Sequence, residues 1–148
     1  MSPRLRSTLA TIVLIVAIVI LLSRSELLGR HPIGIVLQIA AVLLMVWARV
    51  TFGLRSFHAA ANPTAGGLVT SGPYRYWRHP IYAAILLFVW AGIHSQHGPP
   101  SVPALLLAAL ATLMTAVRIQ AEEQLLRATF PEYAAYAART KRVVPFVF

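Results

Sequence analysis

Four apolar segments follow one another along the chain, and each is ended by charged, glycine or proline residues. They cover residues 8–22, 33–50, 80–93 and 102–117. Long apolar runs predict helices that cross a lipid bilayer, for which a helix needs roughly 20 residues. The shorter runs need flanking residues or a locally thinner membrane to do so. We therefore expect membrane spans at approximately residues 8–24, 31–50, 80–97 and 102–122.

The first apolar segment has one feature of a signal peptide, because Arg4 and Arg6 precede it. The residues that end it, 21–24, lack the small-x-small pattern of a cleavage site. We interpret this segment as a membrane anchor.

The stretch between the second and third spans, residues 51–79, is long for a connection in a small domain. Its turn-forming residues are Pro63, Gly66, Gly67, Gly72 and Pro73. The aromatic residues Tyr74, Tyr76 and Trp77 are unusual in a disordered linker. We expect an ordered loop with a function.

The tail, residues 127–148, contains a pattern typical of a helix start. In Thr129-Phe130-Pro131-Glu132 a threonine can serve as N-cap, with a proline in the first turn and a glutamate three residues after the cap. A short amphipathic helix lying in the membrane interface should follow to about Arg139.

The composition agrees with a membrane protein, since 58% of the residues are hydrophobic and only four are acidic. An ordinary soluble domain has about a quarter of its residues charged. We predict a single all-α, polytopic membrane domain over residues 1–148, with about four transmembrane helices plus a C-terminal interfacial helix. The absence of cysteine excludes disulfides, thiolate nucleophiles and cysteine-based metal sites.

The net charge of +9 is spread over the ends of the apolar segments and forms no stripe, which argues against nucleic acid as a partner. If the N-terminus is cytoplasmic, eleven of the 13 basic residues fall on the cytoplasmic side. They are Arg4, Arg6, Arg49, Arg55, Arg75, Arg78, Arg118, Arg127, Arg139, Lys141 and Arg142. Only Arg24 and Arg30 fall outside. This asymmetry predicts that both termini, the loop 51–79 and the tail are cytoplasmic, and that the hairpin 94–100 is not.

Polar residues mark the start of the third span, where the sequence reads Arg78-His79-Pro80-x-Tyr82. Proline suits a first helical turn, and the backbone N–H groups of residues 81–83 should point toward the loop. With the helix dipole and the Arg78 charge they predict a socket for a carboxylate or phosphate. The alternative is a pair of interfacial side chains that anchor a helix end.

The last span carries Arg118, Glu122 and Glu123 near its cytoplasmic boundary. Arg118 and Glu122 are four residues apart, so an ordinary helix salt bridge explains part of the pattern. It leaves Glu123 unexplained. Because an unpaired carboxylate near the membrane is costly, we expect the acids to face a cavity, a cation or an ammonium group.

In the tail, Tyr133 and Tyr136 share one face of the predicted helix and can pack over a flat ring or anchor in lipid headgroups. His94 and His97 lie in the outer hairpin without a third ligand nearby, so no metal site is predicted.

The run from Gly72 to Tyr82 resembles the signature segment of isoprenylcysteine carboxyl methyltransferases and related phospholipid methyltransferases. The rest of the chain is similar to the same family in order and spacing. The matching residues are Arg118-Ile119, Glu122-Glu123, Leu126, Phe130, Tyr133, Tyr136 and Pro145-Phe146. The resemblance covers roughly residues 68–148. At one position Ala84 stands where the family usually has glycine.

This resemblance implies a polytopic enzyme that binds S-adenosylmethionine at the cytosolic ends of its last helices and releases S-adenosylhomocysteine. It implies cofactor-binding roles for Arg78, His79, Pro80, Tyr82, Tyr133 and Tyr136. Arg118, Glu122 and Glu123 would face the point of methyl transfer as catalytic residues. Arg142 is a candidate for holding a substrate.

The methyl acceptor stays open at this stage. We expect a lipidic or small hydrophobic molecule that reaches the site laterally from the bilayer. A carboxylate would arrive ionised and need Arg118 or Arg142, whereas an amine or thiol would need Glu122 or Glu123 as proton acceptor. The alternatives are a phospholipid or small-thiol methyltransferase of the same fold, a sterol-type NADPH reductase, and a non-catalytic membrane assembly protein.

Overall fold

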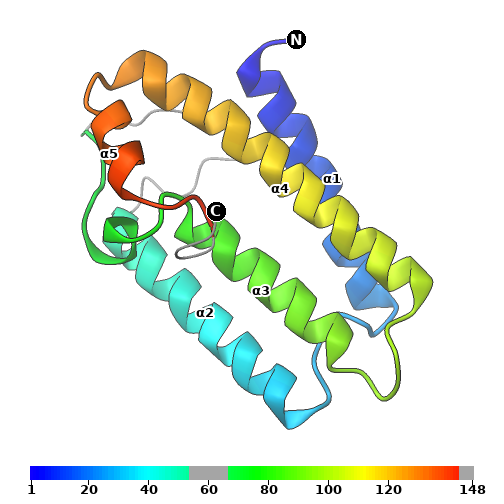
Figure 1. Cartoon of the computed structure of the whole chain (residues 1–148). Helices are drawn as coiled ribbons and strands as arrows, with labels where there is room; N and C mark the ends of the chain where they lie inside the picture. Colours follow the sequence, from blue (N-terminus) through cyan, green and yellow to red (C-terminus); the bar gives the residue numbers. More distant parts are fainter. Residues whose placement is uncertain (54–66, 144–148) are drawn as a thin grey trace.

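A computed structural model describes residues 1–53 and 67–143 as a bundle of helices (Figure 1). The helices are α1 (Pro3–Ser23), α2 (Pro32–Phe52), the 3-10 turn η2 (Gly72–Arg75), α3 (Pro80–His94), α4 (Val102–Thr129) and α5 (Tyr133–Arg139). The all-α prediction is confirmed. The predictions that involve Arg55, Pro63, Gly66, Pro145 and Phe146 lie outside the described residues.

Three helices, α1, α2 and α4, are long and apolar enough to cross a membrane, with 21, 21 and 28 residues. At 1.5 Å per residue α4 is about 42 Å long, so its last turns extend beyond a hydrocarbon core of about 30 Å. Helix α3 is apolar but has only 15 residues. It ends at His94, three residues before the end of the predicted span, while α4 continues beyond the predicted boundary at residue 122.

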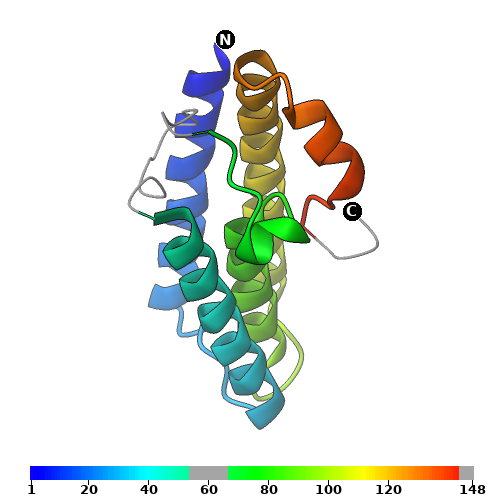
Figure 2. The same ribbon diagram turned by 90° about the vertical axis from the view of Figure 1, so that its left-hand side faces the viewer.

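The four long helices form two antiparallel pairs, α1 beside α4 and α2 beside α3 (Figures 1 and 2). Alanines at positions 104, 108 and 111 of α4 are almost completely buried. Small side chains of this kind let helix backbones approach closely inside a membrane. A cluster of larger buried side chains, including Leu21, Val89 and Ile93, closes the lower part of the bundle.

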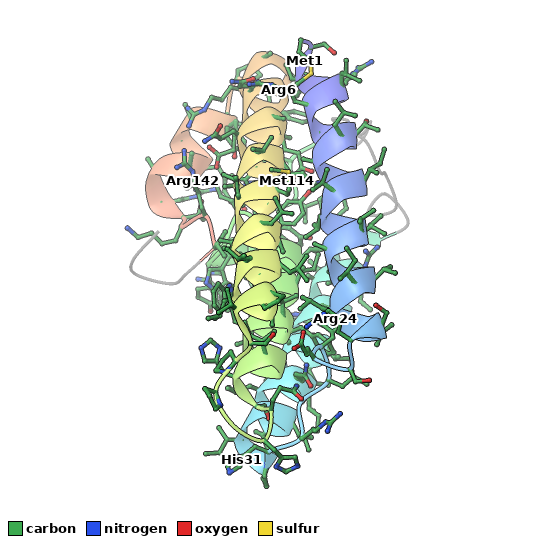
Figure 3. All side chains as sticks on the ribbon, turned by 90° about the vertical axis from the view of Figure 1, so that its right-hand side faces the viewer. Met1, Arg6, Arg24, His31, Met114 and Arg142 are labelled. Carbon is green, nitrogen blue, oxygen red and sulfur yellow. The ribbon has the colours of Figure 1, made fainter. Side chains whose placement is uncertain are left out.

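The outward faces of the bundle are apolar, as lipid contact requires. Side chains project outward along α1 and α4 (Figure 3). Ile15 on α1, Leu43 on α2 and Leu106 on α4 are each more than half exposed. Apolar exposure on this scale has no place in a water-soluble monomer. The chain is therefore an integral membrane protein.

The two ends of the bundle have different polar groups, and each receives a name here. The hairpin end holds the connection 24–31 between α1 and α2 and the hairpin 95–101 between α3 and α4. The α5 end holds the first turn of α3, the last turns of α4, and α5 (Figure 1).

Neutral side chains bonded to backbone groups hold the hairpin end together. The Gln38 amide donates to Leu27 O at 2.8 Å and to Phe88 O at 3.1 Å. The Ser95 hydroxyl donates to His31 O and accepts from His31 N. These bonds join α2, α3 and the first connection.

Helix α5 begins later than the sequence pattern predicts. Its N-cap is Glu132, without a side-chain bond, and Thr129 is the last residue of α4 rather than a cap. Pro131 explains the break, because a residue before proline is disfavoured in the helical region. Phe130 is accordingly extended, with φ −117° and ψ 107°. The predicted end near Arg139 is confirmed.

The part of the loop 51–79 that is described is ordered, as predicted. Pro73 and Tyr74 of η2 are buried. Tyr74 packs its ring against Phe52 at the end of α2, with centroids 5.4 Å apart. The segment before α3 is thereby held against the bundle.

Candidate active site

The predicted polar residues meet at the α5 end. The motif Arg78 to Tyr82 precedes and begins α3, with Pro80 in the first helical turn. Glu122 and Glu123 lie on α4 as it leaves the apolar part of the bundle. Residues far apart in the sequence thus form one cluster.

Glu123 is buried among cations. Only 4% of its surface is exposed. Its carboxylate accepts from Arg78 Nε at 3.0 Å and from Arg142 Nη2 at 3.2 Å. The Nε2 atom of His79 lies 3.4 Å from Glu123 Oε1. Of the surroundings expected for the two acids, a cavity, a cation or an ammonium group, Glu123 has cations, and they are the protein's own guanidinium groups.

Glu122 has a different environment, although it is the next residue. Its Oε1 atom accepts from the Tyr82 hydroxyl and, at 3.0 Å, from Arg118 Nη2. The predicted salt bridge between Arg118 and Glu122 is confirmed. The Glu122 side chain is 20% exposed, so this carboxylate remains accessible where Glu123 is not.

The His79 ring lies between the two acids. Its Nδ1 atom is 3.8 Å from Glu122 Oε2, and its other nitrogen approaches Glu123. The ring is also 5.7 Å from the Tyr82 ring, centroid to centroid. His79 therefore connects the two carboxylate environments.

Arg118 joins three helices. Its Nε donates to the Tyr82 hydroxyl of α3 at 2.7 Å, and its Nη2 donates to Glu122 of α4. Its Nη1 donates to the Thr11 hydroxyl of α1. Only 6% of Arg118 is exposed. The guanidinium is thus held in one orientation by groups from α1, α3 and α4.

The anion socket predicted at the start of α3 is smaller in the structure. Arg78 Nη1 donates to Ala137 O at 2.7 Å and to Thr140 O, so Arg78 contacts the end of α5 as well as Glu123. The Ala83 N–H already donates to His79 O at 3.0 Å. The Arg78 guanidinium, which was expected to face a ligand, instead donates to oxygen atoms of the protein.

The segment after α5 is fastened to the motif by backbone bonds. Arg78 N donates to Lys141 O at 2.7 Å, and His79 N donates to Arg142 O at 3.0 Å. Lys141 N donates back to Tyr76 O at 3.2 Å. These bonds bring Arg142, the predicted substrate residue, against Glu123. Its side chain is 35% exposed, so it also reaches the surface of the cluster.

Tyr133 and Tyr136 face the protein rather than lipid headgroups, with 1% and 3% of their surfaces exposed. Their rings meet edge to face with centroids 6.0 Å apart. The Tyr136 hydroxyl donates to Tyr74 O at 2.7 Å, which ties α5 to η2. Burial raises the pKa of Tyr136 to about 12.

The Tyr133 hydroxyl is buried and, within the described part of the chain, has no hydrogen-bond partner. Burial raises the pKa of Tyr133, and the negative charge of Glu123 adds to the effect. A buried hydroxyl without a partner costs about 1–3 kcal/mol. Such a donor beside charged groups is suited to a ligand.

Thr11 is the contact that sequence reasoning missed. Threonine in an apolar span is unremarkable by itself, and nothing along the chain indicates that α1 packs against α4. Predicting this contact would have required a sequence signal that α1 and α4 are neighbours.

Ala84, the residue that departs from the family pattern, is almost completely buried, with 1% of its surface exposed.

The chain was also compared with the sequence models of known protein families. The sequence model of the isoprenylcysteine carboxyl methyltransferase family matches residues 30–128. This range includes α2, α3 and almost all of α4, with the motif Arg78 to Tyr82 and both glutamates. Helices α1 and α5 lie outside it.

Two curated proteins are similar over part of the chain. The cobalt-zinc-cadmium resistance protein CzcN of Cupriavidus metallidurans is 42% identical over 78 residues. The nickel-cobalt-cadmium resistance protein NccN of Alcaligenes xylosoxydans xylosoxydans is 37% identical over 78 residues. The matched segment is 53% of this chain but only 35% and 36% of those proteins. No solved structure matches the chain.

Proposed function

Since this chain belongs to the isoprenylcysteine carboxyl methyltransferase family, a family of membrane methyltransferases, we propose that it transfers a methyl group from S-adenosylmethionine to a lipidic or small hydrophobic acceptor. The cluster at the α5 end carries this proposal. It combines an accessible carboxylate, a buried carboxylate held by arginines, and a buried hydroxyl donor, all at the end of a membrane-spanning helix.

The residues fit the proposed cofactor in their chemistry. S-adenosylmethionine would supply an electrophilic methyl group on a sulfonium, together with an ammonium and a carboxylate. Glu122 offers an accessible carboxylate to a positive group. The Tyr133 hydroxyl, which has no partner in residues 1–53 and 67–143, offers a donor to a negative or polar group. His79, Pro80, Tyr82, Tyr133 and Tyr136 would form the pocket.

The proposed catalytic residues act by orientation and by exclusion of water. Tyr82 and Arg118 both donate to Glu122, and these two bonds hold its carboxylate in place. A methyl displacement needs in-line positioning of donor and acceptor more than it needs an acid or base. Arg118, Glu122 and Glu123 would provide that positioning.

The structure refines the role proposed for Arg78. Its guanidinium donates to the carbonyls of Ala137 and Thr140 at the end of α5 and to Glu123. Arg78 would thus support the pocket by fixing α5, with Tyr133, over the cluster. Direct contact with a cofactor carboxylate would require it to leave these partners.

Different classes of methyl acceptor would depend on different side chains of the site. A carboxylate acceptor would bind Arg142, whose side chain reaches the surface beside Glu123. An amine or thiol acceptor would depend on Glu122 as base. Neither relative's name states a methyl acceptor, so the site alone supports these two classes. In the cell, the pocket would face the cytoplasm, with both termini on that side.

Calorimetric titration of the detergent-purified protein with S-adenosylhomocysteine tests the proposal. We expect binding to the wild type. Tyr133→Phe should weaken the affinity about tenfold, because the ligand loses one buried hydrogen bond. The stability of the protein without ligand should not fall, since the hydroxyl has no partner to lose among the residues that the structure describes. Tyr76→Phe is the matched control, because Tyr76 is 56% exposed.

The other function classes predict different results in ligand-binding experiments. Thermal stabilisation by NADPH, without any by S-adenosylhomocysteine, would replace the proposal with a reductase. Full cofactor affinity in both Glu123→Gln and His79→Ala would favour a non-catalytic assembly protein.

A further inference from the structure

The orientation of Arg118 depends on a residue of α1, the helix that lies outside the family match. Arg118 donates through Nε to Tyr82, through Nη2 to Glu122 and through Nη1 to Thr11. Two of these partners belong to the motif residues already described. Thr11 does not.

The Thr11 hydroxyl is itself held in a defined orientation. It donates to Ser7 O at 2.7 Å, one turn earlier on α1. Its proton is therefore directed along α1, and its oxygen accepts from the Arg118 guanidinium. Ser7 is completely buried, so the turn of α1 that carries this pair is packed inside the bundle.

An acceptor at this position matters because the guanidinium is shielded from water. Arg118 is 6% exposed, and the buried side chains of α1 around Thr11 are Ser7, Ala10 and Leu14. A charged donor without an acceptor in such a place is costly. If the Thr11 hydroxyl were removed, the guanidinium would be drawn to other acceptors, and the nearest carboxylate is Glu122.

We propose that Thr11 is a positioning residue, which fixes the rotation of the Arg118 guanidinium and thereby the direction in which Glu122 faces the pocket. The inference rests on the proposed function for what Glu122 binds, but not for the contact itself. It gives α1 a part in the site, beyond that of a membrane anchor.

NMR in detergent micelles tests the hydrogen bond between Arg118 and Thr11. The quantity measured is the rate at which the Arg118 Nη–H groups exchange with water. The resonances are assigned by their loss in Arg118→Lys. Thr11→Val replaces the hydroxyl by a methyl group of similar size, and we expect exchange to accelerate about tenfold. Thr11→Ser keeps the hydroxyl and should restore slow exchange. Thr8→Val is the matched control, since the Thr8 hydroxyl donates to Arg4 O on the same helix.

The consequence for the pocket is measured by titration of the same variants with S-adenosylhomocysteine. Thr11→Val should bind about tenfold more weakly, and Thr11→Ser and Thr8→Val should bind as the wild type does. Restoration by serine separates positioning from packing, because serine lacks the threonine methyl group.

The outcomes separate this inference from the function on which it rests. If the wild type does not bind S-adenosylhomocysteine, the proposed function is wrong, and the exchange rates still decide whether Thr11 holds Arg118. If the wild type binds it and Thr11→Val leaves the affinity unchanged, the positioning role is wrong and the function stands. A loss in Thr11→Val that serine does not restore also overturns the positioning role.

Discussion

The two ends of the bundle solve the problem of buried polar groups differently. At the hairpin end, Gln38 and Ser95 bond to backbone groups of neighbouring segments. At the α5 end, charged side chains bond mainly to one another, and the Tyr133 hydroxyl has no partner within the described residues. Neutral side chains whose polar atoms are all hydrogen-bonded to backbone groups hold helices together with a small desolvation penalty. Charged groups with an unmatched donor are poised for a ligand.

Close packing strengthens this contrast. At the hairpin end a side chain on Gly92 would place Cβ 1.8 Å from Leu27 O, a backbone atom that cannot move aside easily. A side chain on Gly34 would place its Cβ 2.1 Å from the Cβ atom of Ser95. At the α5 end, Glu122 and Arg142 stay partly exposed. The hairpin end is therefore tightly packed, whereas polar groups at the α5 end remain accessible.

The largest expected effect is on the stability of the hairpin end. Gly92→Ala must push the Leu27 backbone away, and we expect it to lower the free energy of unfolding by about 4 kcal/mol. Thermal unfolding in detergent measures the loss. Ala109→Val, which adds bulk to an exposed position of α4, is the control and should stay near the wild type. A wild-type melting temperature for Gly92→Ala would show that this end is not tightly closed.

The second prediction compares a glutamate at each end. Glu123→Gln leaves Arg78 and Arg142 without their buried counter-charge, and we expect a loss of about 3 kcal/mol. Glu26→Gln alters an ion pair with Arg24 whose arginine side chain is 44% exposed, so the loss should be much smaller than for Glu123→Gln. Denaturant unfolding of both variants measures the difference. Equal losses would remove the distinction between the two ends.

The smallest expected effect is a pH dependence of the α5 end. An unfolded tyrosine has a pKa near 10, and burial raises that of Tyr136 to about 12. Between these values the folded state keeps a proton that the unfolded state has released. The stability contributed below pH 10 is therefore lost as the pH rises toward 12. Tyr136→Phe should flatten this decline, which unfolding curves at increasing pH measure.

Tyr136→Phe should also lower stability at neutral pH by about 1 kcal/mol, because Tyr74 O loses its donor at 2.7 Å. An unchanged slope between pH 10 and 12 in this variant would assign the decline to other groups.

Much of the site could be predicted from local sequence because its motifs are short. The order Arg78-His79-Pro80 and the spacing of Arg118 and Glu122 are properties of the chain itself, and both residues of that pair share a helix face by geometry. The start of α5 was predicted wrongly because the same four residues fit a helix start and a helix break, and the continuation of α4 decided between them.

The partners of the site residues could not be predicted. That Arg78 binds carbonyls of α5, and that Glu122 and Glu123 face different surroundings, depends on how the tail docks on the motif. Those contacts join residues some 40 to 60 positions apart in the chain.

The membrane class, the all-α fold and the residue types available for chemistry could be predicted from the sequence, because hydropathy and motif spacing are properties of the chain. Two features depend on the folded bundle: α1 supplies Thr11 to Arg118, and the Tyr133 hydroxyl has no hydrogen-bond partner within the described part of the chain. The reason is physical: an apolar helix can pack against several neighbours, and only the assembled bundle sets which buried polar groups meet.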